Sequence, residues 1–145
     1  MSYQLQSTGP PRHPPDATRT RALLERTAAN SRTAVAGAFA LLAGIYAAIS
    51  PWVIHFSRTN PNLTATNLIL GLGVAALGFG LHLAPERMRR LSWTMVPLGM
   101  WFIVSPTSVT AAYNVTAGIV WNNSCTGGMV LLFGLIATHA PWAES

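Results

Sequence analysis

Charged residues are scarce in this sequence, and lysine is absent altogether. Charged side chains make up 9% of the 145 residues, where soluble domains have about 25%, and hydrophobic residues make up 50%. All nine basic residues are arginine, which is typical of a GC-rich bacterial genome. A chain with so few charges predicts a protein that is embedded in a lipid bilayer.

Thiols and carboxylates are equally rare. The single cysteine, Cys125, excludes an internal disulfide, a Cys-x-x-Cys redox pair and a cysteine-based metal cage. The long apolar runs contain no Asp, Glu or Arg, which argues against the proton relays and ion-coupling sites of pumps. We therefore predict no catalytic residues, no metal site and no cofactor. The one enzymatic exception is an electron carrier with a haem between His82 and His139, because neutral imidazole is a common metal ligand.

The basic residues gather in two places. Eight of the nine arginines lie in residues 1–32 and in the link at 86–91. In membrane proteins, segments that are rich in arginine stay on the cytoplasmic side. This clustering accounts for the net charge of +5, which therefore does not indicate a nucleic-acid partner. Residues 1–32 also hold four of the ten prolines, which predicts a disordered Arg/Pro-rich cytoplasmic tail. The alternative is a short helix, capped by Asp16, that lies on the lipid surface.

An apolar run that ends in Ser-Pro occurs twice. Residues 44–52 read GIYAAISPW, and residues 99–107 read GMWFIVSPT. Each run is followed by a polar stretch and then by a second apolar run, which indicates a tandem duplication of one two-helix unit. The predicted organisation after the tail is a first repeat at 33–85, the basic cytoplasmic link at 86–91, a second repeat at 92–141 and a short C-terminal tail at 142–145.

Four stretches are predicted to be transmembrane helices, because about 20 apolar helical residues cross the hydrocarbon layer. They are residues 34–56, 66–84, 92–104 with an extension, and 122–140. The predicted fold is therefore an all-α membrane protein with four transmembrane helices in two tandem two-helix repeats. Both termini are expected in the cytoplasm of a bacterial cell, with the chain crossing the plasma (inner) membrane several times. The sequence leaves open whether residues 106–121 are a loop or an interfacial helix.

The Ser-Pro motif has a physical consequence in lipid. Pro51 has no N–H to donate to the Ala47 carbonyl, and an unpaired carbonyl needs a partner in lipid. We hypothesise that the amide of Asn67, on the neighbouring helix, supplies it. In the second repeat, Asn122 or Asn123 would do the same beside Ser105 and Pro106. The alternative is that Ser-Pro simply ends the helix, with Ser50 capping a short turn and Trp52 anchored at the lipid headgroups.

The tripeptide Ser50-Pro51-Trp52, with Gly44 and Tyr46 before it, resembles the SPW repeat family of small bacterial and archaeal membrane proteins. The second copy departs from the motif, because Thr107 stands where the tryptophan is expected. The resemblance implies a two-helix membrane unit. It does not imply any particular reaction.

We predict a non-enzymatic structural, assembly or accessory subunit of the membrane. Small residues at Ala36, Ala40, Gly44 and Ala48 form a helix face that is a natural docking surface, either for a homo-oligomer or for a larger membrane complex. The alternative is a passive channel or small-solute transporter formed by oligomerisation, with a water-filled path past Asn122 and Asn123.

Overall fold

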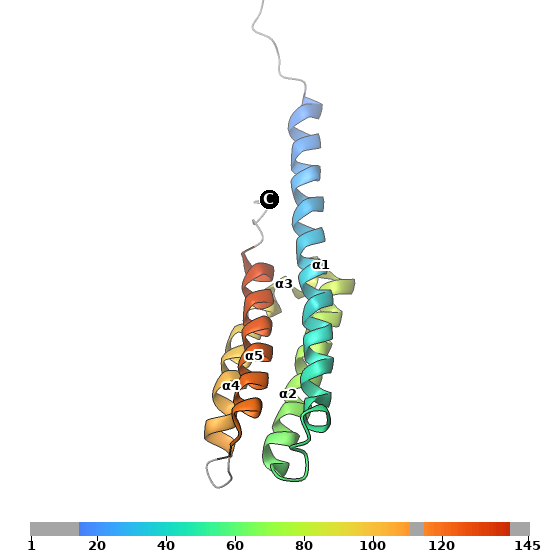
Figure 1. Ribbon diagram of the computed structural model, residues 1–145. Helices are drawn as coiled ribbons and strands as arrows, with labels where there is room; N and C mark the ends of the chain where they lie inside the picture. The colour runs from blue at the N-terminus through green and yellow to red at the C-terminus, as the bar shows by residue number, and fades with distance from the viewer. Residues whose placement is uncertain (1–14, 111–114, 140–145) are drawn as a thin grey trace, which may run out of the picture.

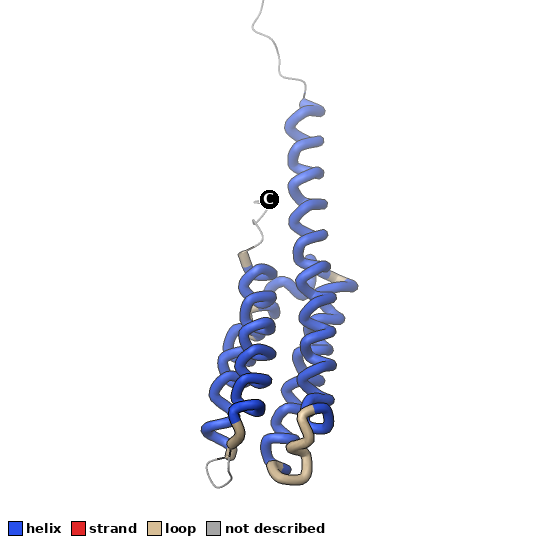
Figure 2. The backbone as a smooth tube through the Cα atoms, in the orientation of Figure 1, coloured by secondary structure: helices blue, strands red, loops and turns tan. Residues whose placement is uncertain are grey.

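Helices make up nearly all of the part of the chain that the structure describes. The structure is a computed structural model, and it describes residues 15–110 and 115–139, within which no strand occurs (Figure 2). The helices are α1 (Pro15–Val53), α2 (Pro61–Leu83), α3 (Pro85–Ser92), α4 (Met95–Val109) and α5 (Ala117–Thr138).

The long helices form two antiparallel pairs that stand side by side. Helix α1 packs against α2, and α4 packs against α5 (Figure 1). The two pairs meet through α1 with α5 and through α2 with α4. Helices α1 and α4 end, and α2 and α5 begin, at one end of the molecule, which we call the turn end. Helix α3 joins the pairs at the opposite end, which we call the α3 end.

Three helices have the length and composition of membrane spans. These are α1, α2 and α5, whereas α4 has 15 residues and measures about 22 Å at 1.5 Å per residue. Helix α4 is short because the chain makes a separate helix at Pro85–Ser92 and bends at Trp93 and Thr94 before α4 begins. The apolar helices indicate a multi-pass membrane protein.

The structure differs from the prediction of a disordered tail. Residues 15–32 are helical and continuous with the apolar part of α1, while residues 1–14 lie outside the described residues. Alanine, leucine, arginine and glutamate in this segment favour a helix, and the apolar span supplies the nucleus from which the helix extends. The prolines are no obstacle, because Pro15 occupies the first helical position, where its missing N–H costs nothing.

The connecting segments are also more helical than expected. The basic link forms α3, and α2 begins at Pro61, five residues before the predicted start at Thr66. The undecided segment 106–121 divides into the end of α4, a connection whose residues 111–114 lie outside the described part, and the first turn of α5. Proline at the first helical position starts both α2 and α3.

Glycines bring the backbones of paired helices into contact. A Cβ atom at Gly44 would lie 2.4 Å from the Ala75 backbone nitrogen, and one at Gly71 would lie 2.5 Å from that of Ala48. The second pair repeats the arrangement, since a Cβ at Gly127 would lie 2.5 Å from the Gly99 carbonyl oxygen. No side chain fits at these positions without moving a helix.

The small-residue face of α1 is therefore used inside the molecule. Ala36, Ala40 and Ala48 are buried, and Gly44 touches the backbone of α2. Close approach of another helix to these small residues is found, but the prediction that this face docks a second copy or a larger complex is wrong. Small residues allow another helix to pack closely against this face, and that helix is α2 of the same chain.

We expect Gly71→Ala to destabilise the protein by about 1–3 kcal/mol, because the new methyl group would separate α1 from α2. Gly73→Ala, on the same helix, is the matched control, since nothing lies within 4 Å of a Cβ there. Unfolding in detergent, followed by circular dichroism, measures both. Equal effects would show that the backbone contact at Gly71 is not important for stability.

Candidate functional site

Buried polar side chains meet where the two helix pairs touch, near the turn end. Asn67 of α2 is 1% exposed, and Ser50 of α1, Ser105 of α4 and Asn123 of α5 are 0% exposed. Each of the four long helices contributes one residue to this group. The sequence analysis selected all four as motif residues, and the structure brings them together.

The two asparagines bond to each other across the boundary between the pairs. Asn67 Nδ2 donates to Asn123 Oδ1 at 3.0 Å, and Asn123 Nδ2 donates to Asn67 Oδ1 at 3.1 Å. The second amide hydrogens are used as well. Asn67 Nδ2 lies 3.3 Å from Ser50 Oγ, and Asn123 Nδ2 lies 3.2 Å from Ser105 Oγ. Both NH₂ groups thus have two acceptors each.

The serines connect the asparagines to the carbonyls that the prolines leave unpaired. Ser50 Oγ donates to the Ala47 carbonyl at 2.9 Å, and Ser105 Oγ donates to the Phe102 carbonyl at 3.0 Å. Each of these carbonyls lies four residues before a proline, and would otherwise accept its N–H. The serine of Ser-Pro therefore pairs the carbonyl that the proline frees.

This arrangement differs from the hypothesis in one step. The amide of Asn67 was expected to reach a freed carbonyl directly, whereas Ser50 stands between them. Nor does Ser-Pro end the helix at Ser50, which was the alternative. Helix α1 continues through Pro51 to Val53.

Tyr46 and Asn122 extend the group on one side only. Tyr46 Oη donates to Asn122 Oδ1 at 2.8 Å, and Asn122 Nδ2 donates to Asn123 Oδ1 at 3.3 Å. This role of Tyr46 was not predicted. The available signal was a phenol within an apolar helix, whose hydroxyl needs a partner, because the second repeat has Trp101, without a hydroxyl, at the corresponding position. We call the six residues the amide network: Tyr46, Ser50, Asn67, Ser105, Asn122 and Asn123.

Both Ser-Pro motifs and both partner asparagines lie in a region that matches a known family. A family model described as the SPW repeat domain matches residues 34–137. The chain belongs to the SPW repeat family. The predicted resemblance is thereby confirmed, and the matched region contains the whole amide network. Searches of curated proteins and of solved structures each returned no significant match.

The third residue of the SPW motif lies outside the amide network. Trp52 is 52% exposed, whereas Pro51 and Pro106 are buried beside their serines. Trp52 therefore points away from the packed helices, at the turn end of α1. An indole in that position suits the boundary between lipid and water, where tryptophan is enriched.

The two histidines proposed as haem ligands contact different helices. His82 Nδ1 lies 3.1 Å from the Ala34 carbonyl of α1, and His139 Nδ1 lies 3.0 Å from the Leu135 carbonyl of its own helix. Within the described residues, no group of three or more His, Cys, Asp or Glu side chains is placed to hold a metal ion.

We expect Asn67→Leu and Asn123→Leu to be coupled. Each single substitution leaves the other amide buried without its partner, and should cost roughly 1–3 kcal/mol. The double substitution removes both polar groups, so its cost should fall below the sum by about 0.6–1.7 kcal/mol. Unfolding free energies of the four proteins in one detergent give the coupling directly.

Asn62→Leu is the matched control, since Asn62 is an exposed residue of the same helix. It should leave stability unchanged. Additive effects of the two network substitutions would contradict a direct bond between the helix pairs.

Proposed function

We propose that this protein is a non-enzymatic membrane subunit with a structural, assembly or accessory role. The observation that carries the proposal is that the amides of the amide network are bonded to the network itself. A solute path past Asn122 and Asn123 would need free or hydrated amides, but these side chains are 8% and 0% exposed. Among the described residues, the only buried side-chain polar atom without a hydrogen-bond partner is Asn60 Oδ1, outside the network. The arrangement is suited to joining helices.

We further infer four membrane crossings, with both termini in the cytoplasm of a bacterial cell. Helix α4 is short, but it pairs with the full-length α5 as α1 pairs with α2. Arg87, Arg89 and Arg90 lie on α3, and four more arginines lie in the first part of α1, toward the same end. Of the arginines in the described residues, Arg58 alone belongs to the turn end. The basic side of a membrane protein faces the cytoplasm.

We also infer that the two helix pairs arose by duplication. The bond from Ser50 to the Ala47 carbonyl has its counterpart at Ser105 and Phe102. The glycine contacts between α1 and α2 have counterparts between α4 and α5. Matching polar bonds and matching glycines at corresponding positions are more specific evidence for a duplication than similar helix lengths are.

An assembly role needs a surface that the fold leaves free. Beyond α3, the first part of α1 extends past the other helices (Figure 1). Its residues 16–28 are all exposed, and Leu23 and Leu24 are 63% and 65% exposed. This projecting arm, residues 16–28, presents apolar side chains on the inferred cytoplasmic side, where a partner protein could bind them.

The inferred topology can be tested by cysteine accessibility in intact cells. In a Cys125→Ser background, we expect Thr59→Cys and Thr116→Cys to react with an impermeant maleimide. Glu86→Cys and His139→Cys should react only after the cells are permeabilised. All four positions are exposed in the structure. Opposite behaviour of Thr59→Cys and Thr116→Cys would mean that α4 does not cross the membrane.

The assembly role can be tested by purification in a mild detergent. We expect the wild-type protein to elute as a complex whose mass exceeds that of one chain. Leu23→Gln combined with Leu24→Gln should release the partner, whereas Ala22→Gln combined with Ala28→Gln, on the same arm, should retain it. A wild-type protein that elutes as a single chain would contradict the proposal, and a homo-oligomer that conducts solute in liposomes would contradict it in favour of a channel.

A further inference from the structure

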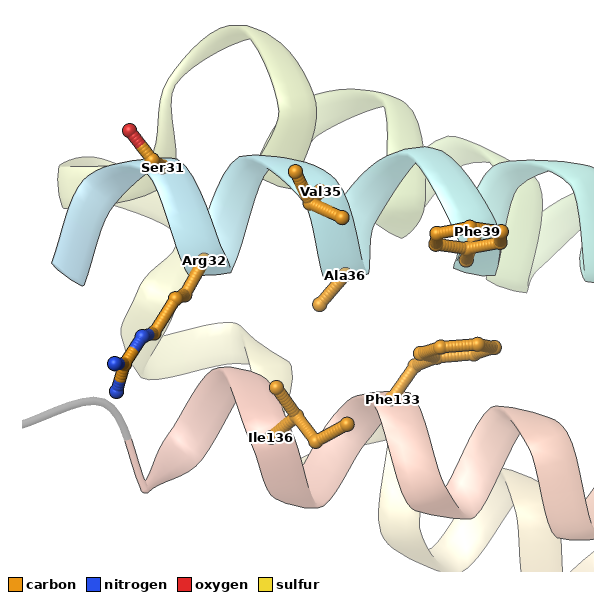
Figure 3. A pocket seen from close by; sticks show the side chains of 7 residues that line it. All are labelled: Ser31, Arg32, Val35, Ala36, Phe39, Phe133 and Ile136. Carbon is orange, nitrogen blue, oxygen red and sulfur yellow. The ribbon is translucent and has the colours of Figure 1, made fainter. Parts of the chain in front are cut away.

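A groove lies between α1 and α5 at the α3 end. It has a volume of about 340 Å³ and is lined by Ser31, Arg32, Val35, Ala36, Phe39, Phe133 and Ile136. Figure 3 shows the apolar side chains of the two helices facing each other across it. The small side chain of Ala36 leaves room between the bulkier Val35 and Ile136. The groove opens where the two helix pairs meet.

The two ends of the groove differ in chemistry. Toward the middle of the molecule, Phe39 and Phe133 stack with ring centroids 5.2 Å apart and an interplanar angle of 8°. At the other end, the guanidinium of Arg32 extends beyond the last turn of α5 (Figure 3). The groove is thus closed by an aromatic pair at one end and opens beside a cationic side chain at the other. Arg32 and Phe39 are seven residues apart on α1, or about 10 Å along the helix.

Arg32 stands at the edge of the apolar part of α1. It is the last charged residue before the uncharged stretch 33–57. Its side chain is exposed, and among the described residues no carboxylate forms an ion pair with it. In a bilayer, an arginine at this depth reaches the level of the lipid phosphates.

We propose that this groove binds one acyl chain of an anionic phospholipid, with the lipid phosphate held by Arg32. An apolar channel that ends in a guanidinium matches the apolar tail and anionic head of such a lipid. Guanidinium and phosphate form paired, charge-assisted hydrogen bonds. The proposal requires only that the helices lie in a bilayer, and goes beyond the structural role proposed above.

The charges around the groove favour a lipid over a second copy of this chain. On another side of the same end of α5, Arg89, Arg90 and Trp93 line a further hollow together with Thr138. Two copies joined at this end would bring arginines toward arginines, which is unfavourable. An anionic headgroup layer attracts them instead.

The groove belongs to the first repeat alone. The residue that corresponds to Ala40 in the second repeat is Met95, where α4 begins. The turns of α1 that carry Arg32, Val35 and Phe39 therefore have no counterpart in α4. This site is thus specific to α1 and α5, and is not a general consequence of the repeated fold.

The test is lipid binding by the purified full-length protein. We would remove bound lipid in detergent and titrate phosphatidylglycerol or phosphatidylcholine with identical acyl chains, counting bound lipids by native mass spectrometry. We expect tighter binding of phosphatidylglycerol. Arg32→Gln should weaken it about fivefold and weaken phosphatidylcholine binding less, because the positive choline group beside that phosphate already reduces its attraction to Arg32. Arg58→Gln, at the turn end, is the matched control and should have no effect.

A second variant tests the apolar part of the site. Ile136→Trp fills the groove without changing the charge, and should weaken binding of both lipids. Val35→Trp fills the groove from the α1 side and should have the same effect. Thermal unfolding verifies that each variant is folded.

Three results would overturn the proposal. Equal binding of the two lipids, or equal effects of Arg32→Gln and Arg58→Gln, would exclude a specific headgroup site. Displacement of phosphatidylglycerol by equimolar inorganic phosphate would indicate a site for free anions. A dimer that Ile136→Trp dissociates in the absence of lipid would show that a second copy fills the groove.

Discussion

Proline leaves a backbone carbonyl without its usual N–H donor, and the interior of this protein is arranged to give that carbonyl another partner. In water such a carbonyl would be hydrated, but between apolar helices a protein group must replace the water. Ser50 pairs with the carbonyl of Ala47, and its own oxygen then accepts a hydrogen from Asn67. Asn67 in turn bonds to Asn123 on the other helix pair. A local defect in α1 is thus resolved by a chain of bonds that joins the two halves of the molecule.

The glycines and the asparagines depend on one another. Gly71 follows Asn67 by one helical turn, and Gly127 follows Asn123 by the same interval, so each glycine shares a helix face with its asparagine. Close approach at Gly71 places α1 near enough for Ser50 to reach the amide. A larger residue would move α1 outward and lengthen that bond. Packing sets the distances, and the polar bonds then favour one register of the helices.

Much of this arrangement could be predicted from the sequence, for definite reasons. Serine, proline and asparagine are conspicuous in apolar runs, and their repetition indicated which residues act together. The bond between Asn67 and Asn123 could not be predicted, because helical periodicity does not say which faces two helix pairs share. A disordered tail was preferred to a helix over residues 15–32 because the prolines and arginines resemble those of disordered segments. Helix α4 begins three residues later than predicted because the turn at Trp93 and Thr94 has no strong sequence signal.

The two ends of the molecule differ in how their polar groups are used. Near the turn end, the amides and hydroxyls of the network bond to protein atoms, which leaves them little capacity to bind anything else. At the α3 end, arginines on α1 and α3 project outward, and the side chain of Asn30 bonds to Glu86 to tie these helices together. Selectivity for another molecule requires polar groups that are accessible as well as held in place. At the α3 end Arg32, Arg87 and Arg90 are exposed, and the bond from Asn30 to Glu86 joins the two helices that carry them, so recognition by this protein is best sought on its basic side.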